Sequence, residues 1–136
     1  MSVYSKLKVV RTEDLDELQH VNNVKYVQWI QDISREHWES VVDKEITNEM
    51  VWVVRNHNIT YFEGAMLNDS LQLSTKILGW KGPISTREVV IRNNKIEKTL
   101  VKAITEWCAV HPKTLKPIRV PAKVVQLFIS GNEDMA

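Results

Sequence analysis

The spacing of apolar residues changes once along this chain, and that change limits the folds that the sequence can adopt. Between residues 23 and about 42, apolar and aromatic side chains recur every three or four positions, which is typical of an amphipathic helix. Asn22 or Asn23 stands where a side chain can cap the first N–H groups of such a helix. We therefore expect one long helix. Its apolar stripe consists of Tyr26, Trp29, Ile30, Ile33, His37, Trp38 and Val41.

The remaining segments are mostly extended. Residues 4–11 mix β-branched side chains with lysines, which predicts a first strand. After the helix, four longer strands are expected over residues 50–63, 70–79, 86–92 and 95–110. Asn93-Asn94 predicts a hairpin turn, since Asn tolerates positive φ. The imperfect alternation of the last strand predicts a bulge, and Pro121 is suited to the first turn of a short terminal helix.

This order of elements predicts an α+β fold in which an antiparallel sheet packs one face on a single helix. One helix cannot cover both faces of a five-stranded sheet. We therefore expect homo-oligomers, a dimer or a tetramer, in which further apolar surface is buried.

Length and composition exclude several classes of protein. The 136 residues suit one domain, which we expect over 1–129, with a flexible tail over 130–136. A formal net charge of +1 gives no reason to expect a nucleic acid or a membrane surface as partner. The N-terminus does not resemble a signal peptide, and no apolar run approaches the ~20 residues of a membrane-spanning helix. Cys108 is the only cysteine, which fits the cytoplasm.

The run from Asp14 to Trp29 carries most of the chemistry. Asp16 precedes the expected helix, and the positive end of a helix favours an ionised carboxylate. Such a carboxylate can attack a carbonyl carbon, or it can take a proton from a water that attacks. The free N–H groups of the helix can bind an oxyanion. Taken alone, Asp16 could equally be a turn residue that accepts hydrogen bonds from nearby N–H groups.

The other polar residues of this run have supporting roles in the same hypothesis. His20 is either a packed or solvent-exposed ring, or a partner of Asp16 or of the substrate carbonyl. Asn22 and Asn23 are expected chiefly as caps that aim the N–H donors. Tyr26, on the first turn of the helix, is expected to border the substrate.

Other motifs are weaker. Cys108 lies near His111, but its neighbours form a strand pattern in which cysteine usually behaves as a small hydrophobe. No metal-ligand spacing and no Gly-rich phosphate loop is present, so no cofactor is expected. Lys81 and Arg87 flank a turn. They form either an ordinary solvated loop or a clamp for the phosphates of a carrier such as coenzyme A.

The run from Asp14 to Trp29 resembles the pattern D-L-D-x-x-Q-H-V-N-N-V-K-Y-x-x-W of plant acyl-ACP thioesterases, which belong with the 4-hydroxybenzoyl-CoA thioesterase-like proteins to the hot-dog-fold thioesterases. Residues 61–71 and 106–121 resemble later strands of that family. The resemblance implies a curved antiparallel sheet wrapped around the long helix, with the acyl group at an interface between subunits.

The same resemblance implies roles for single residues. Asp16 would be the catalytic carboxylate, and the N–H near Asn23 would polarise the thioester carbonyl. The plant enzymes also use an Asn where this chain has Leu18. Their later catalytic Glu aligns with Ala65, and Glu63 lies two positions earlier on the same strand face. A simpler site built around Asp16 is therefore expected.

The leading hypothesis is hydrolysis of an acyl thioester of coenzyme A or acyl carrier protein. Either water assisted by Asp16 attacks the carbonyl, or Asp16 forms a transient anhydride. Two alternatives stay open. The chain could bind acyl thioesters without cleaving them or act as a dehydratase-like relative, or it could be a pure interaction module, which would leave the Asp-His-Asn run without a purpose.

Overall fold

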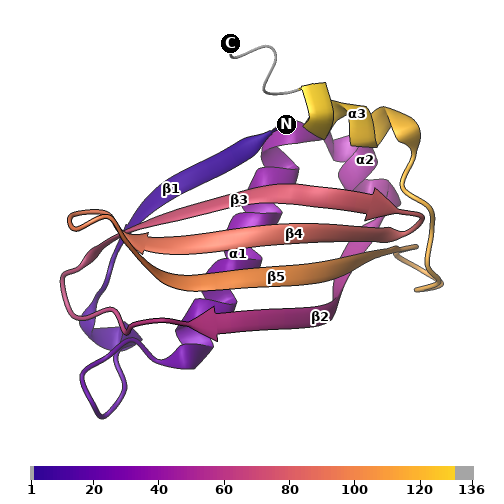
Figure 1. The fold of residues 1–136 in the computed structure, drawn as a ribbon. Coiled ribbons are helices and arrows are strands. Elements are labelled where there is room, and N and C mark those ends of the chain that lie inside the picture. Colours follow the sequence, from indigo (N-terminus) through magenta and orange to yellow (C-terminus); the bar gives the residue numbers. More distant parts are fainter. Residues whose placement is uncertain (1, 131–136) are drawn as a thin grey trace.

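The computed structural model describes residues 2–130. Its elements are β1 (Val3–Val9), the 3-10 helix η1 (Thr12–Asp14), α1 (Asn23–Val41), α2 (Lys44–Glu49), β2 (Val51–Tyr61), β3 (Ser70–Lys81), β4 (Ile84–Asn93), β5 (Lys98–Val110) and α3 (Ala122–Ser130). The five strands form one antiparallel sheet in the order β1-β3-β4-β5-β2. Figure 1 shows α1 running across one face of that sheet. The predicted α+β fold is confirmed, whereas residues 131–136 of the predicted tail lie outside the described part of the chain.

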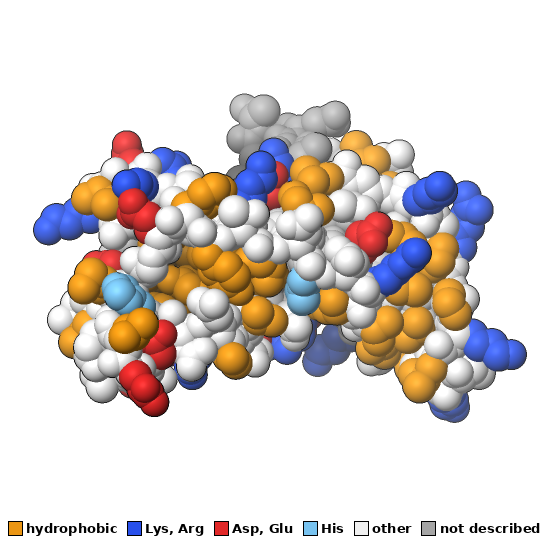
Figure 2. Space-filling model, turned by 60° about the horizontal axis from the view of Figure 1, so that its bottom comes forward, with side chains coloured by type: hydrophobic (Ala, Val, Ile, Leu, Met, Phe, Trp, Pro, Cys, Tyr) orange, Lys and Arg blue, Asp and Glu red, His pale blue; other side chains and the backbone are white. Residues whose placement is uncertain are grey.

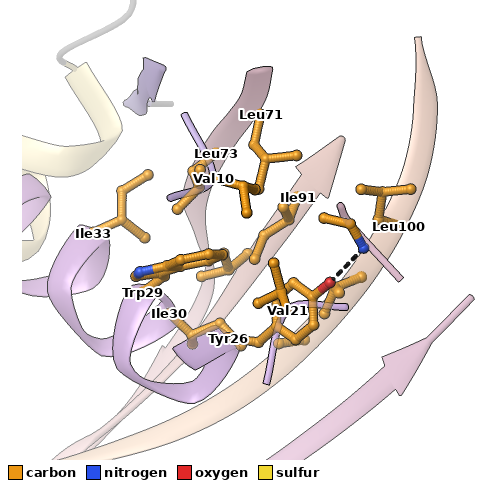
Figure 3. Close-up of a cluster of buried hydrophobic side chains, with 14 residues drawn as sticks. Val10, Val21, Tyr26, Trp29, Ile30, Ile33, Leu71, Leu73, Ile91 and Leu100 are labelled. Carbon is orange, nitrogen blue, oxygen red and sulfur yellow. Dashed lines mark hydrogen bonds between the residues drawn. The ribbon is translucent and has the colours of Figure 1, made fainter. Parts of the chain in front are cut away.

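The main core lies between α1 and the inner face of the sheet. Trp29, Ile30 and Ile33 are at most 5% exposed, and they pack in one cluster with alternate residues of the strands. Figure 3 shows these helix side chains facing strand residues that include Leu73 and Ile91. Fully burying a side chain of this size contributes roughly 1.5–3 kcal/mol relative to leaving it exposed. The predicted apolar stripe of the helix is therefore the stripe that holds it on the sheet.

Local sequence sets the ends of the two consecutive helices. The Asn22 side chain accepts a hydrogen bond from the N–H of Val24, so Asn22 is the N-cap of α1. α1 ends at Val41, one residue before the predicted end, because Val42 is extended. Asp43 then caps the short helix α2, which was not predicted from the sequence. The long helix predicted over residues 23–42 is confirmed.

The outer face of the sheet carries both charged and exposed apolar side chains. Charged side chains stand on that face, and Lys102 Nζ lies 3.7 Å from Glu88 Oε2. Leu7 and Val9 of β1 and Val53 of β2 are exposed apolar residues. β1 and β2 are the two edge strands of the sheet, each with a neighbour on one side only. The homo-oligomer expected from the sequence stays a prediction.

Three irregularities shift the pairing of the strands. Arg55 is unpaired in β2, Leu78 in β3, and Leu100 in β5 where it runs beside β4. A strand that absorbs an extra residue in this way changes which face its following side chains occupy. The bulge predicted in the last strand is confirmed at Leu100.

The predicted hairpin at Asn93-Asn94 is present, but its geometry has a different cause. The Asn93 side chain accepts hydrogen bonds from the N–H groups of Lys95 and Ile96. Glu97, not an Asn, takes the left-handed conformation, with φ of 55°. Asn93 therefore shapes this turn through its side-chain oxygen.

The two ends of the described chain lie together. The N–H of Ser2, just before β1, donates to the carbonyl of Phe128 in α3 at 2.7 Å. Figure 1 shows the N-terminus beside α3. Among the described helices, none is long and apolar enough to cross a membrane.

Candidate active site

A closed loop presents the predicted catalytic residues ahead of α1. Leu15 and Val21 form an antiparallel bridge, and the N–H of Asp16 donates to the carbonyl of His20 at 2.8 Å. Gln19 closes the loop in the left-handed region, with φ of 63°. The loop is therefore a small closed hairpin.

The loop binds only one of the two oxygen atoms of the Asp16 carboxylate. Its Oδ1 atom accepts hydrogen bonds from the N–H of Leu18 at 2.9 Å and from that of His20 at 3.2 Å. No described residue donates a hydrogen bond to Oδ2. The turn role and the catalytic role weighed for Asp16 are thus compatible, because one oxygen serves the loop and the other remains open.

The start of α1 leaves one N–H group open. The N–H of Val24 is taken by the Asn22 side chain, and the N–H of Lys25 donates to the Asn22 carbonyl at 2.8 Å. The first N–H groups of a helix have no acceptor within the helix itself. For the N–H of Asn23, no described residue supplies an acceptor either. This donor lies at the positive end of the helix dipole.

The segment after β2 forms the opposite wall. The carbonyl of Leu100, at the β5 bulge, accepts from the N–H groups of Phe62 and Glu63 at 2.8 and 3.3 Å. A Cβ atom added to Gly64 would stand only 3.1 Å from Cδ2 of His20. The absence of a side chain at Gly64 therefore allows the His20 ring to lie against this wall.

Tyr26 links the helix to this wall. Its hydroxyl oxygen accepts a hydrogen bond from the N–H of Ala65 at 2.9 Å, the dashed line in Figure 3. The Ala65 carbonyl in turn accepts from the N–H of Val21. Burial raises the pKa of Tyr26, so its phenol stays protonated at neutral pH.

These segments enclose the motif cavity, which has a volume of about 300 Å³. Five predicted residues meet in its lining: Asp16, His20, Asn23, Tyr26 and Glu63. Sequence reasoning missed the further lining residues Val21, Tyr61, Phe62 and Gly64. Tyr61 and Phe62 belong to a segment that was considered only for its resemblance to the family. Two aromatic residues directly before Glu63 were the sequence feature that could have identified them as part of the site.

The family model of the acyl-ACP thioesterase N-terminal domain matches residues 2–128. The chain belongs to this family. It is thus a thioester hydrolase, as the resemblance of the Asp14 to Trp29 run implied.

Several individual proteins are similar to this chain over most of their length. The long-chain acyl-CoA thioesterase FadM of Escherichia coli (strain K12) is 23% identical over 120 residues, which cover 85% of this chain and 89% of that protein. The crystal structure of the probable thioesterase YbaW from Escherichia coli has a TM-score of 0.81 at 22% identity and covers 90% of this chain and 94% of its own. A 4-hydroxybenzoyl CoA thioesterase mutant, complexed with 4-hydroxybenzoyl CoA, has a TM-score of 0.84 at 15% identity, covering 93% and 98%. The hot-dog fold is therefore confirmed.

Two acidic residues near the motif cavity of this thioesterase are held by cations. Asp14 is 6% exposed; its Oδ2 accepts from the N–H of Arg11, and its Oδ1 lies 3.8 Å from Lys25 Nζ. This arrangement makes Asp14 a structural residue. Glu63 forms an ion pair with Lys98 of β5 and remains half exposed at the cavity.

Lys81 and Arg87, which the sequence left open as a solvated loop or a phosphate clamp, differ in burial in this thioesterase. Lys81 is exposed at the end of β3, whereas Arg87 is 4% exposed on the inner face of β4 and bonded to His37 and Thr75. Neither residue lines the motif cavity, and neither does Asn22. Within residues 2–130, no group of three or more His, Cys, Asp and Glu could hold a metal ion, and Cys108 is half-buried in β5.

Proposed function

We propose that this thioesterase hydrolyses an acyl-CoA thioester in the motif cavity, with Asp16 as its catalytic carboxylate. The observation that carries the proposal is the juxtaposition of two open groups. The unclaimed Oδ2 of Asp16 and the unclaimed N–H of Asn23 belong to residues that line the same cavity at the start of α1. One is an acceptor that can activate water or attack carbon. The other is a donor that can bind an oxyanion.

In the proposed reaction, the thioester carbonyl oxygen accepts a hydrogen bond from the Asn23 N–H. Either Asp16 removes a proton from an attacking water, or its Oδ2 attacks the carbonyl carbon and forms a mixed anhydride that water then hydrolyses. In both routes the C–S bond breaks, and coenzyme A leaves as a thiolate. A thiolate is a weak base, so the site needs no strong general acid.

The remaining cavity residues are proposed to hold the substrate. The hydroxyl hydrogen of Tyr26 has no described acceptor, so it can donate to the thioester while the oxygen holds Ala65. His20 lies between Asp16 and Gly64 and would orient the acyl group. Glu63 would contact the entering thioester, and Asn22 would act indirectly by fixing the start of α1.

Coenzyme A is the proposed carrier, and acyl carrier protein is the alternative. The relative FadM is named as a long-chain acyl-CoA thioesterase, while the matching family is named for acyl-ACP. The two carriers share the phosphopantetheine thioester, so the motif cavity alone does not separate them. Comparing kcat/KM for one acyl group on both carriers decides between them.

Replacing Asp16 by Asn tests the catalytic assignment. General-base or nucleophilic catalysis of this kind contributes roughly 10²- to 10⁴-fold, so Asp16→Asn is expected to lose activity on that scale. Glu17→Gln is the matched control, because Glu17 is an exposed neighbouring carboxylate that does not line the cavity. Full activity of Asp16→Asn on every thioester that the parent enzyme cleaves would exclude the proposal. Single-turnover hydrolysis in ¹⁸O-labelled water separates the two routes, since only the anhydride route places label in the Asp16 carboxylate.

We also propose that two copies associate along β2. The support is the unpaired edge of this 11-residue strand and the exposed Val53 upon it. Val53→Glu is expected to shift the mass in light scattering from dimer to monomer. Val3→Glu, a change of an equally exposed valine on the opposite edge strand β1, should leave the mass unchanged. A wild-type monomer at the concentrations of the assay would contradict the proposal.

A further inference from the structure

A second and larger cavity lies at the other end of α1. This tryptophan cavity has a volume of about 610 Å³ and is bounded by the C-terminal half of α1, by α2 and by the inner face of the sheet. Its lining includes Trp38, Trp52, Trp80, Trp107 and Arg87, hence four of the five tryptophans of the chain. It shares no lining residue with the motif cavity. At 1.5 Å per helical residue, the positions of Asn23 and Trp38 on α1 are roughly 20 Å apart.

Two strand bulges turn tryptophans into this cavity. Alternation from the inward-facing His57 would place Trp52 on the outer face, but the extra residue Arg55 reverses the phase. Leu78 in β3 does the same for Trp80. Bulges re-aim side chains and recur next to functional sites. Figure 2 shows hydrophobic side chains along the middle of the face that it presents and in a further group at its right-hand end.

Arg87 is a buried cation without a counter-charge. It is 4% exposed, and no described carboxylate lies within ion-pair distance. Its Nη1 atom donates to Nδ1 of His37 at 2.7 Å and to Oγ1 of Thr75 at 3.1 Å. No described residue accepts from Nε or Nη2. An isolated charge in such a place is costly unless a partner satisfies it.

The neighbouring histidine does not supply the missing charge. An arginine only donates, so Nδ1 of His37 accepts, and Nε2 carries the hydrogen. Nε2 donates this hydrogen to Oγ of Ser2, with 2.8 Å between the two heavy atoms. Burial and the Arg87 charge lower the pKa of His37 to about 4, and burial lowers the pKa of Arg87 to about 9. At neutral pH the pair therefore carries one net positive charge beside the cavity.

Two further donors in the same lining lack acceptors. The indole Nε1 atoms of Trp52 and Trp107 are buried and have no hydrogen-bond partner among the described residues. Each unmade bond of a buried donor costs about 1–3 kcal/mol. The lining of the tryptophan cavity thus combines aromatic surface with a cation that lacks a counter-charge, which is the complement of an apolar group that ends in an anionic acceptor.

We propose that the tryptophan cavity binds an apolar carboxylate, with its chain or ring among the tryptophans and its carboxylate group on the guanidinium of Arg87. Two sources share this chemistry. One is the free carboxylic acid, the class of molecule that thioester hydrolysis releases. The other is the far end of an acyl group that carries a second carboxylate. Binding of either does not require Asp16, so it can be measured when hydrolysis is blocked.

Intrinsic fluorescence measures occupancy directly, because most tryptophans line the cavity. Decanoate and 1-decanol are titrated below micelle formation into the wild-type enzyme at neutral pH. Decanoate is expected to change the emission and to bind at least tenfold more tightly than the alcohol, since a charge-assisted hydrogen bond contributes on that scale. Equal affinities, or no binding of decanoate, would overturn the proposal without any variant.

Variants then locate the carboxylate. Arg87→Gln is expected to abolish the preference for the acid while leaving the affinity for 1-decanol unchanged. Arg35→Gln is the matched control, because Arg35 also lines the cavity but is exposed and paired with Asp32 and Glu39. Circular dichroism checks the fold of each. An undiminished preference in folded Arg87→Gln would overturn the assignment. If that variant does not fold, the comparison of acid and alcohol on the wild type decides.

The hydrolysis-deficient Asp16→Asn enzyme separates the two sources. A thioester of coenzyme A with a carboxylate at the far end of its acyl chain is compared with the free monocarboxylic acid. Tighter binding of the thioester identifies the carboxylate as part of a substrate, and tighter binding of the free acid identifies a product or effector. Binding of neither overturns the proposal. Because occupancy is measured without turnover, its failure is distinct from a failure of the Asp16 assignment.

Discussion

The hydroxyl oxygen of Tyr26 accepts a hydrogen bond from the buried N–H of Ala65 at 2.9 Å, which ties the first turn of α1 to the segment that follows β2. The bond joins two parts of the chain that are 39 residues apart and that face each other across the motif cavity. The stability of the fold and the activity of the enzyme should both depend on this hydrogen bond.

Tyr26→Phe should lower stability and activity together. The change leaves the Ala65 N–H buried without an acceptor, which costs about 1–3 kcal/mol of unfolding free energy. It also removes the hydroxyl proposed to donate to substrate. Urea unfolding measures the first effect and kcat/KM the second. An unchanged unfolding free energy would show that this bond contributes nothing to the fold.

Gly64→Ala should reduce activity while sparing the fold. The new Cβ would stand 3.1 Å from His20 Cδ2, so the exposed imidazole must move out of the cavity. We expect kcat/KM to fall on the order of tenfold, because small misplacements of positioning groups are costly. Gly79→Ala is the control, since nothing lies within 4 Å of its added Cβ. Equal activities of the two variants would remove His20 from the proposed site.

Asn22→Ala should cost both stability and turnover, by removing the cap of α1. Loss of an N-cap typically costs about 1 kcal/mol. Asp43→Ala removes the corresponding cap of α2, where the side chain accepts from the N–H of Ile46 at 3.1 Å. Both variants should lose stability, but only Asn22→Ala should also lower kcat, because only α1 begins at the motif cavity. Thermal melts and initial rates separate these outcomes.

Acid should destabilise the protein through His37. Its pKa in the folded protein is about 4, below the ordinary value of 6.5, so between these values the unfolded chain binds more protons and stability rises with pH. From pH 7 to pH 5 the loss amounts to about 2 kcal/mol. His37→Gln keeps an acceptor for Arg87 but cannot titrate. Its unfolding free energy should therefore fall by that much less over the same interval, and parallel pH profiles would contradict this.

The sequence predicted the helical side of the site well because that side is local. Asp16, His20, Asn23 and Tyr26 lie within eleven consecutive residues, where a turn and a helix start determine their positions. The opposite wall is not local. Phe62 and Glu63 are held at the cavity by hydrogen bonds to the carbonyl of Leu100 at the β5 bulge, and the position of that bulge depends on strand pairing that no short segment encodes.

Arg87 shows a different limit. Val89 and Ile91 are buried on the inner face of β4, so strict alternation alone would have placed Arg87 beside them. Its charge instead suggested either a solvated loop or a phosphate clamp shared with Lys81. The guanidinium is buried because it bonds to His37 of α1 and Thr75 of β3, and both residues are distant from Arg87 in the sequence.

The bond between the Ser2 N–H and the Phe128 carbonyl brings the first strand and the last helix side by side. The elements could therefore be connected in a different order along the chain without changing their positions in the fold. A linker between these ends, with a new opening in the turn at residues 94–97, would keep every strand beside its present neighbours. Such a circularly permuted enzyme is expected to fold and to retain its motif cavity, because neither cut nor linker touches the residues that line it.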